Sequence, residues 1–168
     1  MDIIIIVLRV IHILAGIFWT GATVLQTAFL IPTVNALGAE GDKFMKYLMG
    51  KQRLPMYISL SAILCTFTGV VLYWRVSGGL QLALIFAASG LALTIGSVAG
   101  VLAWILGGAA ILPTVTREQA LSKEIQSAGG PPKPELIAEL GRLHKRLGQL
   151  GVWGMILLVI AAVGMAMA

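Results

Sequence analysis

Charged residues are scarce in this chain: Asp, Glu, Lys and Arg make up 11% of its 168 residues, against roughly 25% in a soluble domain. Hydrophobic residues make up 58% and fall in long unbroken runs. So few charges cannot cover a globule with a surface that water solvates. The composition therefore excludes an ordinary soluble domain and indicates an integral membrane protein.

Cysteine is nearly absent, which excludes two further classes of protein. The single cysteine, Cys65, stands in an apolar run, so there is neither a disulfide framework nor a cysteine-based metal motif. No acid–base dyad, nucleophile–base pair or phosphate-binding glycine loop appears, which argues against catalysis of the soluble type and leaves any enzymatic activity open. The net charge of +5 does not indicate a nucleic-acid partner, because the basic residues gather in two loops as membrane topology requires.

Four apolar segments are long enough to cross a bilayer, which takes about 20 helical residues. Their approximate bounds are 3–31, 55–74, 80–112 and 147–168. We predict an all-α fold, with residues 1–168 forming one transmembrane domain built as a bundle of four helices. Because the start of the chain lacks a basic region and a cleavage site, we interpret the first segment as a retained helix and not as a signal peptide.

The basic residues predict how the bundle is oriented. Ten of the 12 Lys and Arg residues lie in the loops at 32–54 and 113–146. Cytoplasmic loops are enriched in these residues, so both loops should be cytoplasmic and both termini should lie on the other side of the cytoplasmic (inner) membrane. Residues 116–126 should extend the third helix and residues 135–146 should run into the fourth, with the Gly-Gly-Pro-Pro sequence at 129–132 as the break.

A weak internal repeat links the two halves of the chain. Residues 30–34 read Leu-Ile-Pro-Thr-Val, and residues 111–115 read Ile-Leu-Pro-Thr-Val. The entries to the second and fourth segments also correspond, with Lys-Gln-Arg-Leu at 51–54 and His-Lys-Arg-Leu at 144–147. Two interpretations are open: two duplicated helix pairs, or coincidence between segments of biased composition.

His12 is the most informative residue, because an ionisable side chain inside a membrane helix is costly and marks a candidate functional site. Polar and small residues at helical spacing place it on one stripe of the first segment, which should face the bundle. The stripe comprises Arg9, His12, Gly16, Trp19, Thr20, Thr23, Gln26 and Thr27. His12 is either a metal or haem ligand, or a structural histidine that bonds to a threonine or to a backbone carbonyl.

Small residues form two further stripes that predict close helix packing. On the third segment they are Ala92, Gly96, Gly100, Ala103 and Gly107. On the fourth segment the stripe runs through Gly141, His144, Gly148, Gly151 and Met155, and either a helix packs closely there or a flat group lies against it. On the second segment Tyr57, Ser61, Cys65 and Thr68 share a face, and we assign them no chemistry because such groups bond back to their own helix.

The run Leu-Arg-Val-Ile-His at 8–12, followed by Trp19 and Gly21, resembles the first helix of the CopD-like membrane proteins, a group that includes the HemJ-type protoporphyrinogen oxidases. The resemblance implies a helical bundle that binds haem b or handles copper, with His12 as the candidate ligand. Unlike the HemJ-type enzymes, this chain has no lysine in the apolar parts of its later segments. Copper handling would also call for more methionine and histidine at the outer face.

We therefore take His12 as the candidate metal ligand, and His12, Arg9, Gly16, Trp19 and His144 as the candidate haem-binding set, with Arg9 near a propionate. The two histidines should not share one haem, because the helical rise separates them by about 15–20 Å along the bundle. His144 can equally be solvated or in contact with lipid headgroups.

The leading functional hypothesis is a haem b-associated redox or electron-transfer component. The alternative is a non-catalytic accessory subunit of a larger membrane complex, with other membrane subunits or further copies of the chain as partners. A copper or small-solute transporter is the weakest hypothesis, because no acidic residue lies within any of the four segments.

Overall fold

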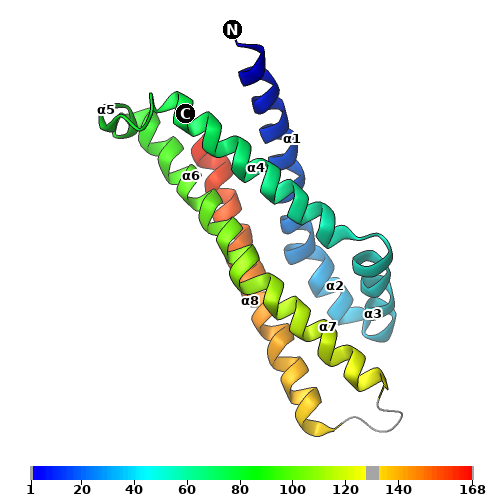
Figure 1. Cartoon of the computed structure of the whole chain (residues 1–168). Helices are drawn as coiled ribbons and strands as arrows, with labels where there is room; N and C mark the ends of the chain where they lie inside the picture. Colours follow the sequence, from blue (N-terminus) through cyan, green and yellow to red (C-terminus); the bar gives the residue numbers. More distant parts are fainter. Residues whose placement is uncertain (1, 128–132, 168) are drawn as a thin grey trace.

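The computed structural model describes residues 2–127 and 133–167, and within these ranges every regular element is a helix (Figure 1). The elements are α1 (Ile3–Leu25), η1 (Gln26–Leu30), α2 (Ile31–Leu37), α3 (Ala39–Lys46), η2 (Tyr47–Lys51), α4 (Leu54–Val76), α5 (Leu82–Ile85), α6 (Ala88–Leu106), η3 (Gly107–Ile111), α7 (Leu112–Ser127) and α8 (Pro134–Ala166), where η marks π-helical segments. Four continuous helices are long and apolar enough to cross a membrane. The predicted all-α, four-helix membrane bundle is therefore confirmed.

The bundle consists of two helix pairs. The most extensive contacts are those of α6 with α8 and of α1 with α4, while α4 with α6 and α1 with α8 join the pairs. Figure 1 shows α6 and α8 running alongside each other, with α1 passing behind α4. A small buried core lies where the pairs meet and draws on all four helices: Ala15, Trp19, Ala62, Cys65, Ala103 and Leu158.

A widened helical turn occurs at the same place in both pairs. The N–H of Ile31 bonds to the carbonyl of Gln26, and the N–H of Leu112 bonds to that of Gly107, each five residues back. In each case a proline follows directly, and its ring crowds the carbonyl four residues earlier, which a wider turn relieves. Both ends of η3 lie 81 residues after those of η1, which is also the separation of Pro32 and Pro113. This shared irregularity favours duplicated pairs over coincidence.

The third spanning helix begins later than the sequence suggested, at Ala88 and not near residue 80. Gly78, Gly79 and Leu80 all have positive φ angles, of 61°, 78° and 69°, and so cannot continue a right-handed helix. The hydroxyl of Ser77 accepts a hydrogen bond from the N–H of Leu80 at 3.1 Å and closes the turn. Only the single helical turn α5 lies between this turn and the start of α6.

Helix continues into both connections at the opposite end of the bundle. α7 extends to Ser127 and α8 begins at Pro134, as expected for the stretches 116–126 and 135–146. The expected break at 129–132 lies outside the described residues. Arg117 Nη2 on α7 pairs with Glu139 Oε1 on α8 at 2.8 Å, which holds the two extensions together beyond the apolar part of the bundle.

Glycine residues allow the backbones of α6 and α8 to approach each other closely. A Cβ built on Gly96 would lie 2.9 Å from the carbonyl oxygen of Ala161, and one on Gly164 would lie 2.6 Å from that of Ala92. The stripe proposed for the third segment is therefore a packing face from Ala92 to Ala103, whereas a Cβ at Gly107 would meet no described atom within 4 Å. On α8 the packing face runs instead through Gly154, Leu158, Ala161 and Gly164, which are buried. Of the stripe expected there, Gly151 approaches Thr27, whereas Gly141 and Gly148 face open space in the described part of the chain.

Candidate functional site

His12 reaches from α1 to the backbone of α4. Its Nδ1 atom lies 2.9 Å from the carbonyl oxygen of Cys65 and 3.3 Å from the hydroxyl oxygen of Thr68. A carbonyl oxygen can only accept, so the hydrogen of the neutral imidazole resides on Nδ1 and is donated to Cys65. The Nε2 atom then carries the free lone pair, and it bonds to no group among the described residues.

Two neighbours on α4 complete the setting of the imidazole. The hydroxyl of Thr68 donates to the carbonyl of Leu64 at 2.6 Å, so its oxygen is free to accept from His12. A Cβ at Gly69 would lie 2.8 Å from His12 Cε1 and 3.2 Å from Nδ1. The missing side chain of Gly69 therefore makes room for the ring. Sequence reasoning missed this role, because it assigned Cys65 and Thr68 no chemistry and did not consider Gly69.

The other residues of the polar stripe differ in how far they are buried. Trp19 is buried, with 7% of its surface exposed, and belongs to the core where the helix pairs meet. A Cβ at Gly16 would lie 3.4 Å from the sulfur of Cys65, so this glycine is close to α4. Arg9 is exposed and does not face the bundle interior. Gly21 is also exposed, and a Cβ there would meet no described atom within 4 Å, so no shaping role is visible for it.

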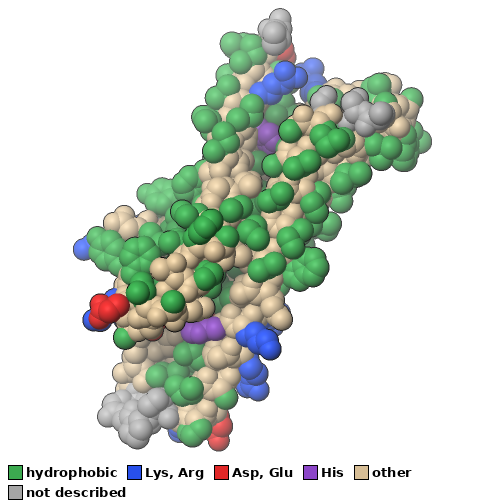
Figure 2. All heavy atoms as spheres, turned by 180° about the vertical axis from the view of Figure 1, so that it is seen from behind, with side chains coloured by type: hydrophobic (Ala, Val, Ile, Leu, Met, Phe, Trp, Pro, Cys, Tyr) green, Lys and Arg blue, Asp and Glu red, His purple; other side chains and the backbone are tan. Residues whose placement is uncertain are grey.

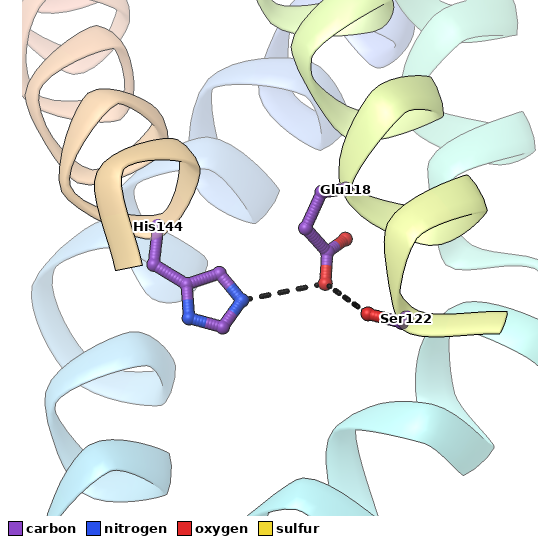
Figure 3. Close-up of polar contacts among 3 residues, drawn as sticks. All are labelled: Glu118, Ser122 and His144. Carbon is purple, nitrogen blue, oxygen red and sulfur yellow. Dashed lines mark hydrogen bonds and ion pairs between the residues drawn. The ribbon is translucent and has the colours of Figure 1, made fainter. Parts of the chain in front are cut away.

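His144 belongs to a separate polar group between α7 and α8. Its Nε2 atom lies 3.3 Å from Glu118 Oε1, and Ser122 donates to the same oxygen at 3.4 Å. Figure 3 shows both side chains converging on the carboxylate of Glu118. The His144 side chain is 59% exposed, so this contact stabilises little. Figure 2 shows the two histidine side chains toward opposite ends of the molecule, as the helical rise predicts.

The chemistry of this end of the bundle thus rests on one imidazole. Within the described residues there is no group of three or more His, Cys, Asp or Glu side chains that could hold a metal ion. An imidazole whose Nδ1 bonds to a carbonyl and whose Nε2 has no partner among the described residues matches two roles: a metal or haem ligand held by its other ring nitrogen, and a structural histidine that joins two helices.

No family model, no curated protein and no solved structure matches this chain. The resemblance of residues 8–21 to the first helix of the CopD-like proteins therefore stays an expectation from the sequence. Any function has to be argued from the geometry around His12.

Replacing Gly69 by alanine should displace the imidazole of His12, because the added Cβ would overlap the ring. We expect loss of the bond to the Cys65 carbonyl, which is worth about 1 kcal/mol. The ¹⁵N chemical shifts of the ring report it, since they distinguish the tautomer held in the wild type from a tautomer mixture. Gly21→Ala on α1 is the control, because a Cβ there meets no described atom within 4 Å. Wild-type ring shifts in Gly69→Ala would contradict the placement of the imidazole.

Proposed function

We propose that the protein is a haem b-binding component of an electron-transfer system in the cytoplasmic membrane, with Nε2 of His12 as an axial ligand. The observation that supports this is the hydrogen bond from Nδ1 to the Cys65 carbonyl. Histidines that ligate metals almost always donate their other ring N–H to a carbonyl, a carboxylate or water, which fixes the tautomer and orients the ring. A bound haem would supply a centre that takes up and gives back single electrons.

The neighbouring residues have distinct parts in this proposal. Thr68 and the Cys65 carbonyl hold the donor edge of the ring, and Gly69 leaves it the space it occupies. Arg9 lies one helical turn before His12 and is exposed, and its charge suits a propionate at the edge of the bundle. Trp19 and Gly16 keep α1 close to the core and to α4.

A position among other membrane subunits accords with the exposure of α1. In an apolar stretch of 18 residues, only 6% of the first spanning helix is buried, whereas 17% is buried in the corresponding stretch of each of the other three helices. α1 presents large apolar side chains on one broad exposed face, including Ile13, Leu14, Ile17 and Phe18. A surface of this kind is suited to lipid or to further helices. The described residues offer no second imidazole near His12, so any further ligand of a bound haem would be a non-histidine side chain or a group from a partner, or that position would be open.

The proposed orientation places His12 toward the non-cytoplasmic side. Figure 2 shows Lys and Arg side chains mainly in the lower part of the molecule, beyond the apolar belt, with a smaller group near the upper end. The lower group comes from the connections at 32–54 and 113–146, which favours a cytoplasmic position for them. Both termini would then lie outside.

A non-catalytic accessory subunit is the second candidate, and one observation favours it. The bonds of His12 to Cys65 and Thr68 join α1 to α4, and an interhelical hydrogen bond of this kind stabilises a membrane bundle by about 0.6 kcal/mol without any cofactor. In that case His12 is a structural residue, and the function resides in the partners that the bundle binds.

Absorption spectra of the wild-type protein separate the two candidates. Protein purified in detergent from haem-replete cells should have a Soret band, and dithionite should shift the band and sharpen the absorption at longer wavelength. The expectation rests on the free Nε2 of His12. A well-folded protein that is colourless, and that stays so after incubation with haem, would rule out the haem function and leave the accessory subunit.

A further inference from the structure

An open hollow of about 790 Å³ lies on the outer side of α8, along residues 145–156. Its lining changes character along the helix. Lys145, Arg146 and Gln149 line one end, and Val152, Trp153 and Ile156 line the other. The two ends lie within about 17 Å along the helix axis at 1.5 Å per residue. A ligand that fills the hollow must therefore be charged at one end and apolar at the other.

The charged end lacks compensating acids. Lys145 and Arg146 form no ion pair within the described residues, whereas nearby Arg117 and His144 pair with Glu139 and Glu118. Two uncompensated cations next to each other attract an anion, and Gln149 one turn later adds an amide donor. A phosphate-type group matches this end of the hollow.

The apolar end is not covered by the bundle. Trp153 is 61% exposed, and Val152 and Ile156 are also exposed. A Cβ at Gly148 would meet no described atom within 4 Å, so this glycine leaves a notch between the basic pair and the apolar side chains. An extended hydrocarbon chain fits along such a surface, because it would cover side chains that no other helix contacts.

The hollow also lies at the level where a membrane surface has to be. From residue 147 to the end, the sequence has no charged residue, whereas residues 133–146 are rich in charge. The basic pair therefore lies at the headgroup level, and tryptophan is enriched at this interface. Figure 2 shows several Lys and Arg side chains in the lower part of the molecule.

We propose that this hollow binds an anionic phospholipid, with its phosphate group at Lys145, Arg146 and Gln149 and one acyl chain along Val152, Trp153 and Ile156. Charge complementarity selects the anionic headgroup. The apolar half of the hollow selects a lipid over free phosphate, because phosphate alone would leave Trp153 exposed. The inference is independent of haem and holds for either candidate function.

Native mass spectrometry of the full-length protein in detergent tests the proposal. Phosphatidylglycerol should be retained in preference to phosphatidylcholine, and the double variant Lys145→Gln/Arg146→Gln should bind it roughly tenfold less tightly. The control Lys46→Gln/Lys123→Gln removes the same two charges from exposed sites elsewhere and should bind as the wild type does. Equal losses in both double variants, or no preference between the two lipids, would overturn the proposal.

Two further variants separate a lipid from free phosphate and leave the charge unchanged. Trp153→Ala and Gly148→Leu alter the apolar end and the notch, and both should weaken retention of phosphatidylglycerol. If both variants bind the lipid as the wild type does, or if millimolar inorganic phosphate displaces it fully, the site is a phosphate site and the proposal is wrong. Because all the substituted side chains are exposed or open, unchanged elution in size exclusion serves as the check on folding.

Discussion

Replacing His12 by alanine should abolish the Soret band of the purified protein, whereas His144→Ala should leave the band at its wild-type height. His12 carries the free Nε2 on a ring that is already oriented by the Cys65 carbonyl. His144 lies toward the opposite end of the molecule and directs its own Nε2 to Glu118. The ratio of Soret absorbance to protein absorbance measures the result. Equal loss in both variants, or a full band in His12→Ala, would contradict ligation by His12.

Imidazole in solution distinguishes a lost ligand from a lost fold. His12→Ala removes the ring as well as its bonds to α4, so the variant could lose haem because α1 and α4 separate. If His12 is the ligand, free imidazole should occupy the space beside Gly69, where the ring was, and restore the band. If His12 only holds the helices together, free imidazole should restore neither the band nor the thermal stability of the variant.

The four spanning helices, and the need of His12 for a polar partner, could be predicted from the sequence, because both depend on local properties. A run of apolar residues is a membrane helix wherever its partners lie, and a histidine inside such a run needs a polar partner. The partners themselves could not be identified. The acceptor is the backbone carbonyl of Cys65, which every residue has, and the clearance comes from Gly69. Both depend on the register between α1 and α4, which brings together residues more than 50 positions apart in the chain.

The packing face of α8 is a second feature that could not be predicted from the sequence. Small residues occur on several sides of this helix, so spacing alone favoured the side with Gly141 and Gly148 over the side with Gly164. The choice depends on α6, whose glycines and alanines need an equally smooth partner surface. The widened turns before Pro32 and Pro113 are the reverse case. Their signal is present in the repeated Pro-Thr-Val sequence, which by itself leaves duplication and coincidence open and does not indicate a change of helical pitch.

Gly164→Ala should destabilise the protein by roughly 1–3 kcal/mol, the usual range for overpacking. The added Cβ would lie 2.6 Å from the carbonyl oxygen of Ala92 and 2.8 Å from the Cα of Gly96. Both are backbone atoms, so no side-chain rotation relieves the overlap and α6 must move away from α8. Movement of α6 would loosen the most extensive interface of the bundle. A fall in the thermal unfolding midpoint in detergent or nanodiscs measures the loss.

Gly141→Ala makes the same chemical change on the same helix and should have the opposite sign. A Cβ there meets no described atom within 4 Å, and alanine is favoured over glycine inside a helix by about 0.8–1.0 kcal/mol. The unfolding midpoint should therefore stay the same or rise. A comparable fall in both variants would mean that alanine is tolerated poorly anywhere on α8. A fall at Gly164 alone would show that α6 and α8 are joined by direct backbone contact and not by the amount of hydrophobic surface they bury.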